Sequence, residues 1–226
     1  MDLSTTLVSD QNPNSLARRF RQARARRIVE LIEVICAEKG LVRILDMGGD
    51  PVYWDRYFDR GFLERSGAHV TIVNPIAWQR PSDPMFELVE GDACSLPEYA
   101  DNSFDLTHSN SVIEHVGDWP RMEAFATESR RLAPRYYVQT PYFWFPIEPH
   151  FSAAFFHWRP EQSRARALLK RGYGWSDRAA DIGEAMREVQ DARLLDRTQF
   201  RFLFPDAVYP DESLAGLTKS LIAIRH

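Results

Sequence analysis

Short apolar segments alternate with amphipathic segments over much of this chain. Five apolar runs, rich in aliphatic and β-branched residues, are predicted to form strands at residues 42–47, 69–73, 86–89, 104–108 and 135–139. Helical patterns lie between several of these runs, most clearly at residues 53–65 and 118–132. Short buried strands that alternate with helices form parallel sheets covered on both faces, so the pattern predicts an α/β fold with a doubly wound sheet. In such folds ligands bind at the carboxyl ends of the strands.

A long amphipathic helix is predicted ahead of the first strand. Asn14 or Ser15 can cap its start, and Gly40 can end it. Its apolar face comprises Phe20, Ile28, Leu31, Ile32 and Ile35. Its first half carries Arg18, Arg19, Arg21, Arg24, Arg26 and Arg27. We interpret these arginines as a solvated face or an active-site cover rather than a nucleic-acid arm, because the remainder of the chain is acidic.

The alternation of strands and helices breaks after Pro141. Residues 142–160 are dense in aromatic residues and prolines, and residues 161–190 are polar with a helical pattern. A long interruption of this kind is typical of a lid or a binding loop. Regularity returns with a helix at residues 198–203 and strands at residues 207–209 and 217–224. We expect a single domain over residues 1–226, with a cover helix at 14–40, a core at 41–141, an insertion at 142–195 and a C-terminal helix and hairpin at 196–226.

The composition narrows the classes of partner. A chain of 226 residues with 44% apolar and 27% charged residues is ordinary for one globular domain. Its net charge of −4 disfavours nucleic acid as the main partner. Cys36 and Cys94 form neither a metal-binding pattern nor a disulfide framework. Residues 1–15 lack a signal-peptide core and no run is long enough to span a membrane, so a cytoplasmic location without membrane attachment is expected. The oligomeric state is not predicted.

Acidic residues surround a pair of glycines at the end of the first predicted strand. The segment reads Asp46-Met47-Gly48-Gly49-Asp50, and its glycines allow the backbone to approach a ligand closely. Carboxylates at this place repel the pyrophosphate that a dinucleotide-binding loop would hold, and they attract a cation. The loop therefore indicates a positively charged ligand without phosphate. It disfavours a nicotinamide-dependent oxidoreductase, which also needs Gly-x-Gly-x-x-Gly and an acid about 20 residues further on.

Motifs at four successive strand ends resemble those of the class I S-adenosylmethionine-dependent methyltransferases, over roughly residue 28 to the C-terminus. The first motif is the glycine loop. The second strand ends in Asn74, where that family has an acid, and the third ends in Gly91-Asp92-Ala93. The fourth motif, at residues 104–116, includes Ser109-Asn110 and Val112-Ile113-Glu114-His115-Val116. The resemblance implies a Rossmann-like seven-stranded sheet, with six parallel strands and one antiparallel strand, and a helical and aromatic lid.

The same resemblance implies the methyl donor S-adenosylmethionine and the product S-adenosylhomocysteine. Asp46 would bind the methionyl ammonium directly or through water, beside Gly48 and Gly49. The remaining donor contacts would come from Asn74 at the ribose, from Asp92 and Ala93 at the adenine, and from Ser109 and Asn110. Two departures point to a subfamily variation: Asp50 and Val52 stand where glycines are usual, and Asn74 carries no charge.

The acceptor is expected to be a small molecule that is methylated at a hydroxyl oxygen. Such a reaction needs a base, and His115 and His150 are candidates because imidazole accepts a proton near neutral pH. His108 is expected to pack within its strand. Tyr142, Trp144 and Phe145 are predicted to wall the acceptor pocket. Two alternatives stay open: a non-catalytic module that binds S-adenosylmethionine, and an RNA methyltransferase that uses the arginine-rich helix.

Metal dependence also stays open. Glu114-His115 with a downstream histidine is similar to the metal-assisted small-RNA 3′-end and quinone O-methyltransferases. Those enzymes carry a second glutamate three residues before the pair, where this chain has Ser111. Because loss of a carboxylate weakens a site for a hard cation, no metal is assigned.

Overall fold

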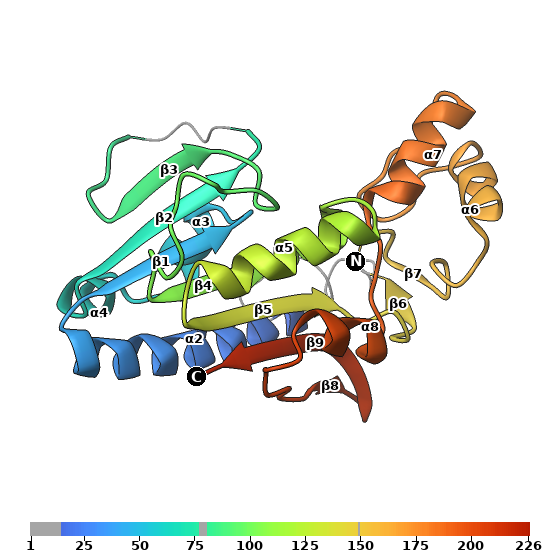
Figure 1. Ribbon diagram of the computed structural model, residues 1–226. Coiled ribbons are helices and arrows are strands. Elements are labelled where there is room, and N and C mark those ends of the chain that lie inside the picture. The colour runs from blue at the N-terminus through green and yellow to red at the C-terminus, as the bar shows by residue number, and fades with distance from the viewer. Residues whose placement is uncertain (1–14, 77–80, 149) are drawn as a thin grey trace.

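A seven-stranded sheet in the order β3-β2-β1-β4-β5-β9-β8 forms the centre of the molecule (Figure 1). The computed structural model describes residues 15–76, 81–148 and 150–226. The strands of the sheet are β1 (Val42–Met47), β2 (Ala68–Asn74), β3 (Phe86–Glu90), β4 (Leu106–Asn110), β5 (Arg135–Pro141), β8 (Glu212–Leu214) and β9 (Leu217–Arg225). The pairs that link β3, β2, β1, β4 and β5 are parallel, and β9 runs antiparallel to both β5 and β8. The predicted Rossmann-like sheet, with one strand reversed, is confirmed.

Helices cover both faces of this sheet. One face packs against α2 (Leu16–Lys39), α3 (Pro51–Tyr57) and α4 (Arg60–Arg65). The other face packs against α5 (Trp119–Arg131) and α8 (Arg197–Leu203), and Figure 1 shows α5 and α2 on opposite sides of the strands. Successive side chains of β1 point to opposite faces of the sheet: Ile44 packs in the core on the α2 side, and Leu45 packs in the core on the α5 side. Because β1, β4 and β5 are parallel, their carboxyl ends meet at one edge of the sheet, as the sequence predicts.

The caps of α2 follow the sequence signals. The Ser15 hydroxyl oxygen accepts from the Arg18 amide at 3.2 Å, and Gly40 ends the helix with a φ of 76° while its amide donates to the Cys36 carbonyl at 2.8 Å. Asn14, the other candidate cap, lies outside the described residues. No helix in the described ranges is both long and apolar enough to cross a membrane.

Two predicted elements differ from the structure. The helix predicted at residues 53–65 is divided, because Asp59 caps a new helix through the Phe62 amide at 2.7 Å. The strand predicted at residues 207–209 was wrong, since Val208 forms only an isolated bridge with Ile224 and the edge strand is β8. Pro210 follows directly and has no amide to continue a ladder, so pairing resumes only beyond it.

The insertion after β5 builds a small layer of its own. It contains β6 (Ile147–Glu148), β7 (Ala153–Ala154), α6 (Glu161–Leu168) and α7 (Ile182–Asp191), and it extends beyond the end of the sheet in Figure 1. Its members bury a separate apolar cluster formed by Phe151, Phe156, Ala165, Leu168, Ala179, Ala185 and Val189. Two rings of the aromatic segment, Phe151 and Phe156, therefore stabilise the insertion itself rather than wall a pocket at the sheet.

Candidate functional site

The loop after β1 has room only for glycine at two successive positions. Gly48 has a φ of 77°, and a Cβ atom there would lie 2.4 Å from Val112 Cγ1. A Cβ on Gly49 would lie 1.8 Å from Asp46 Oδ2. The Gly48 amide donates to the Val73 carbonyl at 2.7 Å, so the loop stays tied to the end of β2. Glycine is required at both positions because Val112 and Asp46 occupy the space that a side chain would need, at the end of β1 where ligands of this fold bind.

Asp46 lies beneath this loop, and its side chain has no exposed surface. Its Oδ2 accepts from Trp54 Nε1 and its Oδ1 contacts His108 Nδ1, both at 2.7 Å. Each oxygen thus has one protein partner, and a contact between Asp46 and the donor ammonium, directly or through water, stays a prediction. Asp46 also ties the end of β1 to Trp54 of α3 and to His108 of β4, and the prediction for His108 as a packed strand residue is confirmed.

Aromatic rings enclose the Asp46–His108 pair. The Tyr53 and Tyr137 rings each stack on the His108 ring, with centroids 5.4 and 5.8 Å away and interplanar angles of 18° and 19°. The Trp54 ring meets the His108 ring edge-on at 5.3 Å. This aromatic support was not predicted, although Tyr53 and Trp54 follow shortly after the glycine loop.

The other residues predicted to bind the methyl donor make hydrogen bonds to neighbouring strands, loops and helices. Asn74 Nδ2 donates to the Gly49 carbonyl at 3.1 Å, which ties β2 to the loop. The Ser109 hydroxyl is buried and donates to the Met47 carbonyl at 3.1 Å, so it faces protein rather than a ligand. Asn110 Oδ1 accepts from Arg24 Nη1 at 3.0 Å.

Asp92 is half exposed beyond β3, next to the buried Ala93. Arg121 binds its carboxylate with both terminal nitrogens, at 2.7 and 2.8 Å, and the Cys94 amide adds a bond of 3.0 Å. The hydrogen bonds from Arg121 outweigh partial burial and lower the pKa of Asp92. Asp92 is therefore an oriented, ionised acceptor: Oδ1 accepts from both Arg121 and the Cys94 amide, whereas Oδ2 accepts only from Arg121 and keeps a second lone pair for a ligand amino group.

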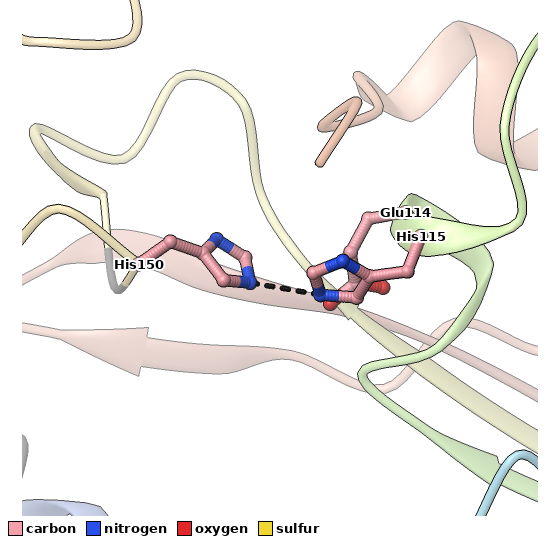
Figure 2. A group of neighbouring side chains, drawn as sticks. All are labelled: Glu114, His115 and His150. Atoms are coloured by element: carbon pink, nitrogen blue, oxygen red, sulfur yellow. Dashed lines mark hydrogen bonds between the residues drawn. The ribbon is translucent and has the colours of Figure 1, made fainter. Parts of the chain in front are cut away.

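The structure brings His115 and His150 together at the carboxyl edge of β4 and β5 (Figure 2). Their Nε2 atoms lie 3.0 Å apart. His115 belongs to the short helix η1 (Ile113–His115), and its Nδ1 lies 3.0 Å from Asp191 Oδ2 of α7. With Asp191 accepting the Nδ1 proton, the lone pair of His115 Nε2 faces His150.

Glu114 completes this cluster from below. Its side chain is fully buried, Oε2 accepts from the Thr140 hydroxyl at 2.9 Å, and Oε1 has no hydrogen-bond partner among the described residues. Burial raises the pKa of Glu114. One ligand atom from each of Glu114, His115 and His150 lies within 4.8 Å of the others, which suits either proton transfer or a divalent cation.

A cavity of about 130 Å³ lies between α2, the ends of β4 and β5, and β9. Tyr142 and Phe145 line it, as predicted for an acceptor pocket. Trp144 does not line it, because its ring is 54% exposed and packs against Phe143 and Trp158. The aromatic segment thus contributes part of the wall, and α2 and β9 contribute the remainder.

Arg24 is the main residue of this region that the sequence analysis misassigned. It is 5% exposed and binds Glu212 of β8 through Nε at 2.8 Å and Nη2 at 2.5 Å. The same guanidinium donates to Asn110, Gln139 and Ser220 at 2.8–3.0 Å. The sequence contains a signal for the burial of Arg24, because this residue lies four positions from both Phe20 and Ile28 on the apolar face of the helix.

A family model described as a methyltransferase domain matches residues 62–135. The strand order β3-β2-β1-β4-β5-β9-β8 agrees with this match. The two findings support a class I S-adenosylmethionine-dependent methyltransferase. Its methyl donor is S-adenosylmethionine. No protein of curated function matches this methyltransferase.

Several solved structures share the fold of this methyltransferase. The carbon methyltransferase CurJ is 11% identical with a TM-score of 0.56, over 99% of this chain and 60% of that chain. A Rhodobacter sphaeroides protein provisionally described as a Zn-dependent alcohol dehydrogenase is 12% identical with a TM-score of 0.50, over 90% of this chain and 96% of that chain. A Burkholderia thailandensis 1,6-didemethyltoxoflavin N1-methyltransferase with bound S-adenosylhomocysteine is 15% identical with a TM-score of 0.49, over 92% of this chain and 80% of that chain. At these identities the similarity concerns the fold alone.

Proposed function

We propose that this methyltransferase transfers the methyl group of S-adenosylmethionine to a hydroxyl oxygen of a small molecule, with the His115–His150 pair accepting the proton. The observation that carries the proposal is the 3.0 Å contact between the two Nε2 atoms. Neither histidine is among the residues that line the cavity; the pair is linked to it through Thr140, which binds Glu114 and directly precedes the cavity residues Pro141 and Tyr142. A base placed beside an acceptor pocket can take the proton as the oxygen attacks.

The proposed reaction is an in-line displacement. The acceptor oxygen forms a bond to the methyl carbon, the bond from that carbon to sulfur breaks, and S-adenosylhomocysteine leaves as a neutral thioether. The hydroxyl proton passes to an imidazole nitrogen of the pair. Asp191 orients His115 and stabilises the imidazolium that forms, because its Oδ2 lies 3.0 Å from Nδ1.

The glycine loop and Asp92 are proposed to bind the donor. Gly48 and Gly49 allow the tight turn at the end of β1, and the buried Asp46 carboxylate packs against Gly49. The Asp92 carboxylate is proposed to accept from the adenine amino group while Arg121 keeps it in place.

Methyl transfer from radiolabelled S-adenosylmethionine to a panel of phenols and aliphatic alcohols tests the proposal. Label in an ether product supports it. Tight donor binding without transfer to any acceptor would instead favour the non-catalytic module, and label confined to amines would contradict hydroxyl methylation.

The Oε1 atom of Glu114, which has no hydrogen-bond partner within the described ranges, favours a second candidate, in which the reaction is metal-assisted. Glu114, His115 and His150 would hold a divalent cation, which would lower the pKa of the acceptor hydroxyl. Dialysis against EDTA, followed by addition of Mg²⁺, Mn²⁺ or Zn²⁺, separates the two candidates. Full activity without metal supports the histidine base, and activity restored only by a cation supports the metal-assisted reaction.

Replacing Asp92 by alanine is expected to weaken S-adenosylmethionine binding by about 10- to 100-fold, the effect of losing a hydrogen bond to a charged group. The fold should persist because this carboxylate is half exposed. Calorimetry measures the affinity, and circular dichroism checks the fold. Asp101→Ala, which removes another exposed carboxylate paired with an arginine, is the control and should bind the donor normally.

Replacing Glu114 by glutamine is expected to raise the free energy of unfolding at pH 7 by about 0.5–2 kcal/mol while lowering turnover. A carboxyl with a raised pKa loses its contribution to stability as pH rises through that pKa, so the ionised group is costly at pH 7. Urea denaturation in EDTA measures the change.

Glu128→Gln is a control that is expected to change the free energy of unfolding in the opposite direction. The hydrogen bonds from Arg131 lower the pKa of Glu128, so its contribution is present at neutral pH and lost only in acid. This variant should be less stable than the wild type at pH 7. Equal destabilisation of both variants would contradict the assignment for Glu114.

A further inference from the structure

The cavity between α2, β5 and β9 carries an excess of positive charge. Arg21, Arg24 and Lys219 line it, and none of its lining residues in the described part of the chain is acidic. The neighbouring carboxylate of Glu212 makes two hydrogen bonds to Arg24. A cavity with this balance attracts an anion, because opposite charges interact strongly where water is partly excluded.

The pKa of Lys219 reflects both its burial and the excess of positive charge around the cavity. Its Nζ lies 3.8 Å from Glu212 Oε1 and 4.9 Å from the centre of the Phe20 ring. Burial, together with the charge of Arg24, lowers the pKa of Lys219 to about 8. An anion bound beside Nζ would stabilise the ammonium.

The side-chain amide of Gln139 has a donor without an acceptor in the described part of the chain. Its side chain is 1% exposed, and its Oε1 accepts from Arg24 Nη1 at 2.8 Å and from the Ser111 hydroxyl at 3.1 Å. These two bonds fix the amide orientation, so Nε2 is the remaining group, and it has no hydrogen-bond partner among the described residues. A buried donor without an acceptor is costly, and an oxygen of a ligand in this cavity would satisfy it.

The remainder of the wall is mostly apolar. Its apolar members are Leu16, Ala17, Phe20, Pro141, Tyr142, Phe145, Ile147 and Leu214. A ligand that matches both the cationic and the apolar parts of the wall has one anionic group and an apolar body. A cavity of about 130 Å³ admits only a small ligand.

We propose that the acceptor is a small organic acid whose carboxylate is bound by Lys219, Arg21 and Gln139. The apolar body of the acid contacts Phe20, Tyr142 and Phe145. A carboxylate fits better than a phosphate ester because its two oxygens match few donors in a mainly apolar wall. This inference rests on the proposed function for the identity of the bound molecule as the acceptor, and the binding of the acid is measured without methyl transfer.

Calorimetry on the full chain saturated with S-adenosylhomocysteine tests the proposal with matched probes. The acids are 4-hydroxybenzoate and 4-hydroxyphenylacetate, their neutral partners are the corresponding amides, and phenyl phosphate is the third class. Each acid is expected to bind at least about tenfold more tightly than its amide, as for one charge-assisted hydrogen bond. Equal affinities of acid and amide, no binding of either acid at millimolar concentration, or a preference for the phosphate would overturn the proposal.

Substitutions in the cavity wall test whether the preference for acid over amide arises there. Lys219→Met is expected to reduce the acid-to-amide preference towards one and to leave amide binding intact. Arg21→Met removes a cation from a different element, α2, and should act in the same direction, which covers the case in which one variant fails to fold. Lys170→Met, at an exposed lysine of the insertion, should keep the full preference.

Two results distinguish this inference from the proposed function. An acid that binds selectively but is never methylated supports the anion site and counts against the proposed function. Methyl transfer to neutral phenols as fast as to the acids supports the proposed function and overturns the anion site.

Discussion

Replacing Glu212 by glutamine is expected to lower the free energy of unfolding at pH 7 by about 3–5 kcal/mol, because it leaves the buried Arg24 guanidinium without its counter-charge. Native domains have only about 5–15 kcal/mol in total, so this is a large share of the stability. The pair joins the N-terminal helix to the edge strand of the sheet, and Arg24 also donates to Gln139 of β5. Glutamine keeps the size of the side chain, so the loss reflects charge rather than volume.

Urea denaturation followed by circular dichroism measures this change. Glu38→Gln, which removes a more exposed carboxylate paired with Arg135, is the control and should cost far less. Burial alone would raise the pKa of Glu212, but the hydrogen bonds and charge of Arg24 hold it below its ordinary value of 4.5. Its contribution to stability is therefore complete above that pH and is lost as the pH falls through the lowered pKa. A difference between wild type and variant that persists unchanged in strong acid would contradict this explanation.

Replacing His115 by alanine is expected to lower the rate of methyl transfer by about 10²- to 10⁴-fold, the usual contribution of a general base. The affinity for S-adenosylmethionine should stay the same, because the donor loop and Asp92 follow other strands of the sheet. Single-turnover rates measure the transfer step, and calorimetry measures donor binding. A loss of the same size in both quantities would indicate a structural role for His115.

His69→Ala is the matched control for this variant. His69 is exposed on β2, so its removal should change neither rate nor affinity. The His115 variant should also be assayed after dialysis against EDTA. A rate that falls on metal removal in the wild type, but not in the variant, would assign the effect of His115 to a cation rather than to proton transfer.

Both predictions concern contacts between elements that are distant in the sequence. Arg24 and Glu212 are 188 positions apart, and His115 and His150 are 35 positions apart. His150 could be named as a candidate because of its residue type, but its partner could not. Asp191, which orients His115, had no signal at all in a polar helical segment.

The alternation of strands and helices, the long capped helix and the glycine loop after the first strand could all be predicted from the sequence. These features depend on local periodicity and on residues with special backbone freedom, such as Gly48 with its φ of 77°. Three features became clear only from the packing of the elements: Asp46 lies under the loop, Arg24 is buried, and α2, β5 and β9 line one cavity. Burial and hydrogen-bond partners depend on how separate elements pack, and a polar side chain has the same local pattern whether it meets water or a distant residue.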